Sequence, residues 1–155
     1  MLSIQEMNIR CLPENYSFKY HYYHYFSWPN LLYVAEDLET DKIVGYVLGK
    51  VDDAKESELN QEKAHVTSLA VHHKYRYLFN IRRLGIAANL MEQTHRMMKE
   101  VFGMKTVTLH VRFSNIAARN LYLERLKYTQ VNIDKGYYAD GEDACLLYTS
   151  DAADE

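Results

Sequence analysis

The sequence predicts a mixed α/β fold in which helices cover both faces of one β-sheet. Three observations predict it. The chain has 155 residues, 48% hydrophobic and 25% charged, which suits one domain with a real core. Segments with helical periodicity alternate with β-rich runs, and Gly, Pro or charged residues separate them without repeats or low-complexity linkers. Two pairs of β-rich runs joined by polar segments predict hairpins.

The first half of the chain predicts two helices followed by three strands. The helices cover residues 2–10 and 17–26, and the strands cover residues 31–35, 43–51 and 66–71. The second helix ends at Trp28-Pro29, because the residue before proline avoids helical geometry. Polar residues 36–42 join the first two strands into a predicted hairpin. The acidic stretch 52–63 predicts a solvated loop, and the strand after it is apolar throughout, as in a strand covered on both faces.

The second half predicts helix, strand, helix and a closing hairpin. Ile86, Leu90, Met91 and Met98 recur at helical spacing, so residues 86–101 predict an amphipathic helix whose methionines belong to the core. Residues 106–112 predict a strand, and Ser114 or Asn115 is expected to cap the next helix. The hairpin is expected over residues 128–138 and 144–148, around Asp140-Gly141.

Composition excludes several classes of function. The net charge is −3 with no basic patch, so nucleic acid is not expected as a ligand. Cys11 and Cys145 are too few for a disulfide framework and too distant for a zinc motif, so we expect a cytosolic protein without a metal. No apolar run has the length of a membrane helix, and the N-terminus does not resemble a signal peptide, so no membrane association is expected.

One short motif points to chemistry, namely Arg82-Arg83-Leu84-Gly85-Ile86-Ala87 between a buried strand and a helix. Such a turn directs backbone N–H groups and the positive end of the helix dipole toward one point, which suits a pyrophosphate. The two arginines add cationic donors. The motif matches neither the nucleoside triphosphate loop nor the dinucleotide loop. Taken alone, a single Gly in such a loop favours a tight turn with surface arginines over a binding site.

This motif matches the [QR]-x-x-G-x-[GA] signature of GNAT acetyltransferases. Over residues 4–144 the chain also resembles the catalytic subunits of N-terminal acetyltransferase A. That resemblance rests on residues 12–16, 27–29, 44–47, 67–71, 109–112 and 137–144. It implies the GNAT fold, with a mostly antiparallel mixed sheet, acetyl-CoA as cosubstrate, no metal, and the α-amine of protein N-termini as acceptor.

The resemblance also assigns residues to the cofactor. The residues implied in cofactor binding are Leu69, Ala70, Val71, Arg82, Arg83, Leu84, Gly85, Ile86, Ala87 and Asn115. The backbone of 69–71 would bind the pantetheine arm, and the turn before the 86–101 helix would hold the pyrophosphate. The N–H of Leu69 would stabilise the oxyanion, and Tyr122 would protonate the departing thiolate. A buried helix tyrosine without a catalytic role is the alternative for Tyr122.

The acceptor needs only a weak base, because an α-amine with a pKa of about 8 is partly neutral near pH 7. Glu14, His65 and His110 are the candidates, each acting directly or through a water. A structural role stays open for both histidines, and Glu14 could serve only to position the peptide. The residues implied in binding the peptide are Leu12, Pro13, Glu14, Tyr16, Tyr137 and Tyr138.

The resemblance further implies a large helical-repeat auxiliary subunit and docking at the ribosome. Two other functions remain open. One is a GNAT enzyme that acetylates lysine or a small amine. The other is a non-catalytic domain that binds acyl-CoA or a protein partner.

The sequence departs from the family pattern in three places. Ten residues separate Val71 from Arg82, about six more than the family carries, and a retained short intron and a native loop both explain this surplus. We expect the first strand of the family to precede Leu2. We expect the GNAT domain to cover residues 1–144 and interpret residues 145–155 as a foreign tail, because they resemble a translated sequencing adapter.

Overall fold

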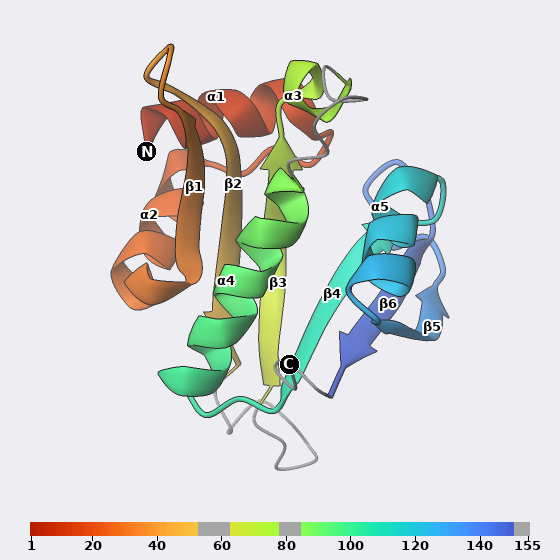
Figure 1. The fold of residues 1–155 in the computed structure, drawn as a ribbon. Helices are drawn as coiled ribbons and strands as arrows, with labels where there is room; N and C mark the ends of the chain where they lie inside the picture. Colours follow the sequence, from red (N-terminus) through yellow and green to blue (C-terminus); the bar gives the residue numbers. More distant parts are fainter. Residues whose placement is uncertain (53–62, 78–84, 151–155) are drawn as a thin grey trace.

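The computed structural model describes residues 1–52, 63–77 and 85–150, which form a six-stranded sheet with helices on both faces (Figure 1). The strand order is β1-β2-β3-β4-β6-β5. The strands are β1 (Leu32–Asp37), β2 (Lys42–Val51), β3 (Lys63–Val71), β4 (Thr106–Arg112), β5 (Thr129–Asp134) and β6 (Ala144–Thr149). Only β3 and β4 pair in parallel, so the mixed, mostly antiparallel sheet is confirmed.

The helices divide between the two faces of this sheet (Figure 1). The helical segments are α1 (Leu2–Cys11), α2 (Phe18–Ser27), the 3₁₀ turn η1 (Pro29–Leu31), α3 (His73–Tyr77), α4 (Ile86–Glu100), α5 (Ile116–Asn120) and the π-helical turn η2 (Leu121–Arg125). In Figure 1, α4 and α5 lie in front of the sheet, whereas α1 and α2 lie behind it. The short α3 was not predicted, because five residues are too few to show helical periodicity.

Two apolar clusters hold the helices against the sheet. The larger cluster lies between α4 and the sheet and includes Met91, Met98 and Leu109, all nearly fully buried, so the prediction that the α4 methionines belong to the core is confirmed. The smaller cluster packs Ile4 and Met7 of α1 on the opposite face. Each such side chain contributes roughly 1.5–3 kcal/mol when fully buried.

The feature of the sheet that positions the site is the divergence of β3 from β4, which is visible in Figure 1. The two strands pair only from Lys63 and Thr106 to Val66 and Leu109, and they separate beyond that point. The register between β2 and β3 shifts at the same level, where Thr67 is the extra residue of a β-bulge. Beyond Val66, β3 still pairs with β2, but its other edge faces an opening where β4 has separated from it.

Some expectations differ from the structure or fall outside it. Strand β3 begins at Lys63, three residues before the predicted start, because pairing with β2 extends it. Residues 145–149 of the segment that we interpreted as a foreign tail lie in β6, between β4 and β5, so the origin of this tail stays a prediction. The acidic residues 53–62, most of the surplus before Arg82, and residues 151–155 lie outside the described residues. Within the described ranges, no helix has the length and apolar character to cross a membrane.

Candidate active site

A cavity of about 550 Å³ occupies the opening between β3 and β4. Its walls come from both strands, the loop between α1 and α2, the segment α5–η2 and the loop between β5 and β6. The four side chains predicted for acid–base chemistry, Glu14, His65, His110 and Tyr122, all line it. So do the six residues predicted to bind the peptide: Leu12, Pro13, Glu14, Tyr16, Tyr137 and Tyr138.

The predicted cofactor residues other than Gly85 divide into three groups. Leu69, Ala70, Val71, Ala87 and Asn115 line the cavity. Ile86 instead directs its side chain toward β1 and β2, where it lines a shallower hollow and lies close to Gly45, so only its backbone remains available to the cofactor. Arg82, Arg83 and Leu84 lie outside the described residues.

The start of α4 has the conformation that a close approach of an anion requires. Gly85 caps the helix with φ +57°, in the left-handed region that other residues adopt only at a cost. A Cβ atom at this position would lie 2.8 Å from the Arg125 guanidinium. The sequence analysis did not identify Arg125, which brings a cation from η2 to the end of α4 that carries the positive dipole.

Tyr122 lies in η2 and is only 7% exposed. Burial raises the pKa of its phenol, so the O–H group keeps its proton at neutral pH and can donate it. The ring of Tyr128 packs edge-on against that of Tyr122, with centroids 5.8 Å apart. The Tyr128 hydroxyl in turn lies 2.5 Å from Nε2 of the buried His95, which fixes the position of Tyr128 behind the cavity wall.

The two candidate histidines have different surroundings although their rings are only 5.7 Å apart. Nδ1 of His65 lies 2.9 Å from the Thr108 hydroxyl, and burial, assisted by the neighbouring His110, lowers the pKa of His65 to about 4. Nε2 of His110 lies 2.9 Å from Oδ2 of Asp134, and the His110 ring stacks on Tyr137 with centroids 4.3 Å apart. His65 is therefore neutral at physiological pH, whereas His110 has a carboxylate partner.

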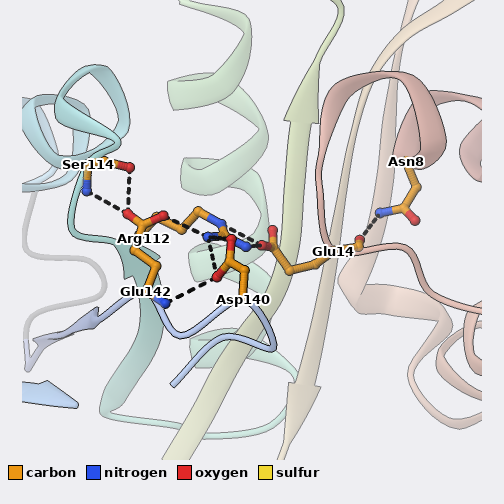
Figure 2. A network of polar contacts seen from close by, with 6 residues as sticks. All are labelled: Asn8, Glu14, Arg112, Ser114, Asp140 and Glu142. Carbon is orange, nitrogen blue, oxygen red and sulfur yellow. Dashed lines mark hydrogen bonds and ion pairs between the residues drawn. The ribbon is translucent and has the colours of Figure 1, made fainter. Parts of the chain in front are cut away.

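Arg112 joins the two loops at the peptide end of the cavity (Figure 2). Its Nε and Nη2 donate to Glu14 at 2.6 and 2.5 Å, and Nη1 donates to Asp140 at 2.8 Å and to Glu142 at 2.7 Å. Hydrogen bonds from Ser114, followed by those from Arg112, lower the pKa of Glu142 to about 2. One guanidinium thus faces three carboxylates, of which Glu14 lines the cavity, whereas Asp140 and Glu142 are not part of its wall.

Asn8 of α1 also holds the loop that carries Glu14. Its side chain is fully buried, and Nδ2 donates to the Glu14 carbonyl at 3.0 Å (Figure 2) and to the Tyr46 hydroxyl at 3.1 Å. Oδ1 accepts from the Tyr16 backbone N–H at 2.9 Å. The backbone on both sides of Asn15 is therefore fixed by one side chain.

Sequence reasoning missed the supporting residues of the site. Arg112 stands two positions after His110 on β4, so period-two alternation could have placed both side chains on one face. Asp134 and Asn8 gave no such signal, because each reaches the site only through tertiary packing. Within the described ranges, no group of three or more His, Cys, Asp or Glu side chains is arranged to hold a metal ion.

Known proteins resemble this chain along nearly its whole length. Residues 1–128 match the model of the Acetyltransferase (GNAT) family. The N-alpha-acetyltransferase daf-31 of Caenorhabditis elegans is 49% identical over 95% of this chain and 75% of its own length. The N-terminal acetyltransferase A complex catalytic subunit of Arabidopsis thaliana is 49% identical over 93% of this chain and 69% of its own length. A crystal structure of the NatC complex bound to Gag peptide and CoA matches with a TM-score of 0.83 and 26% identity, covering 96% of this chain and 89% of that one.

Proposed function

Because the chain belongs to the GNAT acetyltransferase family, and within it to the group of N-terminal acetyltransferase A catalytic subunits, we propose that it acetylates the α-amine of protein N-termini with acetyl-CoA. The observation that carries the proposal is the cavity between β3 and β4. The neutral phenol of Tyr122 lies in its wall, and the ion pair of Glu14 with Arg112 lies at the peptide end.

The cosubstrate binds along the edge of β3 that β4 leaves unpaired. The backbone of 69–71 faces the cavity, which favours strand-like hydrogen bonding to the amides of the pantetheine arm. The Val71 carbonyl also accepts a hydrogen bond from Nε of Arg76 in α3 at 2.5 Å. The pantetheine arm would therefore share this acceptor with the Arg76 side chain. The N-terminus of α4, with Gly85 and the arginines around it, holds the pyrophosphate.

The reaction is direct attack of the amine on the thioester in a ternary complex. The α-amine, with a pKa of about 8, loses one proton to a weak base, and its lone pair forms the new C–N bond. The N–H of Leu69 stabilises the oxyanion, and Tyr122 gives its proton to the thiolate as the C–S bond breaks. Each proton has one donor and one acceptor, so the step balances without an oxidant or a reductant.

The groove around Arg112 binds the first residues of the acceptor. Tyr16 and Tyr138 line it with raised phenol pKa values, caused first by burial, so both hydroxyls remain protonated and can donate hydrogen bonds to peptide carbonyls. We also propose that the chain works in the cytoplasm with a large helical-repeat auxiliary subunit at the ribosome, since its relatives include catalytic subunits of complexes.

Three peptides test this function. We expect acetylation of a Ser-starting and an Asp-starting peptide, and no acetylation of a third peptide that has a blocked N-terminus and a free lysine side chain. Mass spectrometry locates the acetyl group. Acetylation of lysine alone would favour the lysine-acceptor alternative. Acetyl-CoA binding without transfer to any of these peptides would favour the non-catalytic domain.

A further inference from the structure

The His110–Asp134 pair is held more firmly than a surface ion pair. The side chain of His110 is 19% exposed and that of Asp134 is 30% exposed. Asp134 ends β5 and reaches His110 across β6, since it pairs with Ala144, whose β4 partner is Arg112. Tyr137 covers one face of the imidazole in parallel stacking, at an interplanar angle of 12°. The ring therefore has one defined orientation.

This geometry specifies which nitrogen of His110 carries a proton. A carboxylate oxygen can only accept, so Nε2 of His110 must be the donor in the 2.9 Å contact with Asp134. In the neutral imidazole the other nitrogen, Nδ1, is then an unprotonated acceptor. Nδ1 is buried and has no hydrogen-bond partner among the described residues. A buried polar atom without a partner is costly, and at a catalytic cavity it is the atom that a substrate proton can satisfy.

The two other candidate bases are less suited to accept this proton. Nδ1 of His65 is hydrogen-bonded to Thr108, and with a pKa of about 4 His65 is a weak proton acceptor at neutral pH. Oε1 of Glu14 accepts from both Nε and Nη2 of Arg112, which stabilises the ionised carboxylate. His110 alone combines a free acceptor atom with a carboxylate that stabilises its protonated form.

We propose that Asp134 is a positioning residue that holds the His110 tautomer with Nδ1 free and thereby makes His110 the proton acceptor in acetyl transfer. This inference rests on the proposed function. One proton passes from the attacking amine to Nδ1 of His110, directly or through one water. The imidazolium that forms is stabilised by Asp134, which stays ionised.

The charges around His110 determine how a pH profile is interpreted. His65 faces it from β3, Asp134 from β5 and Tyr137 from the following loop. Lys50 of β2 and the Arg112 cluster on β4 line the same cavity. Of these groups, only Asp134 makes a hydrogen bond to His110 among the printed contacts of the described residues, so its removal changes the imidazolium most directly.

The test replaces Asp134 by Asn and measures kcat against pH with a Ser-starting peptide. An Asn amide can donate to Nε2 and move the imidazole proton to Nδ1, so we expect kcat at pH 7.5 to fall by about 10- to 100-fold, within the contribution of a general base. The residual acid limb should move to lower pH, because the imidazolium loses its carboxylate. Asp134→Glu keeps the charge and should recover most of the activity.

Asp143→Asn is the matched control, because it makes the same change in the same hairpin. Asp143 bonds Lys135 Nζ at 2.7 Å and the Gly136 N–H at 3.0 Å, and it is not part of the cavity wall. We expect its kcat to equal that of the wild-type protein. Acetyl-CoA affinity by calorimetry should be unchanged in all three variants.

Two results would overturn the assignment. One is an Asp134→Asn variant with the wild-type rate and pH profile. The other is a loss of activity that accompanies a loss of acetyl-CoA affinity and is not recovered in Asp134→Glu, since that pattern indicates a purely structural role. A wild-type protein that acetylates no α-amine at all would instead refute the proposed function.

Discussion

Replacing Asn8 by Ala should both destabilise the fold and weaken peptide binding. Asn8 is fully buried and makes three hydrogen bonds, to the Glu14 carbonyl, the Tyr46 hydroxyl and the Tyr16 N–H. Together with Gln5, whose Nε2 donates to the Tyr16 carbonyl at 3.1 Å, Asn8 connects α1 to the loop that carries Glu14. The variant removes the Asn8 connection, and Asn8 itself is not part of the cavity wall.

The expected size of the effect follows from the three bonds. Each intramolecular hydrogen bond contributes about 1 kcal/mol net, and a buried group left without its partner costs more, so we expect a loss of about 2–4 kcal/mol in the free energy of unfolding. For a domain of this length, that corresponds to a fall in Tm of roughly 4–16 °C. The freed loop should raise the peptide KM, whereas the acetyl-CoA site on β3 and α4 should be unaffected.

Urea unfolding, peptide kinetics and calorimetry with acetyl-CoA measure these three quantities. Asn15→Ala is the control, because it makes the same change in the same loop at an exposed position and should alter stability by less than about 0.5 kcal/mol. If Asn8→Ala unfolds at the urea concentration of the wild-type protein and keeps its peptide KM, the proposed role of Asn8 is wrong.

Three further results are expected. Arg82→Ala combined with Arg83→Ala should weaken acetyl-CoA binding by at least about tenfold, because each charged hydrogen bond contributes about 1.5–3 kcal/mol; an unchanged calorimetric Kd would refute the pyrophosphate assignment. Tyr122→Phe should lower kcat by about 100-fold with both affinities intact, and a wild-type kcat would make Tyr122 structural. Burial lowers the pKa of His95 to about 4, so the unfolded chain binds more protons than the native one between about pH 6.5 and 4, and stability should fall as the pH falls through this window. His95→Gln should flatten that slope between pH 7 and 5, and an identical slope in urea unfolding would contradict it.

The sequence by itself determined the elements and the family. Helical periodicity in 86–101 and β-rich runs at 43–51 and 106–112 are local patterns, and the structure confirms α4, β2 and β4 with nearly the same bounds. The motif that contains Gly85 depends on a local backbone conformation, and Gly85 indeed has a positive φ. Such features can be predicted because neighbouring residues alone fix them.

Only the tertiary structure decided the surroundings of the candidate catalytic side chains. Glu14, His65 and His110 were equivalent in the sequence, because what distinguishes a base is its surroundings and these come from distant segments. Glu14 pairs with Arg112, 98 positions along the chain, and His110 pairs with Asp134, 24 positions along. Burial lowers the pKa of His65, whereas His110 lies within hydrogen-bond distance of Asp134. Long-range packing sets hydration and hydrogen bonding, and these distinguish two imidazoles that the sequence cannot tell apart.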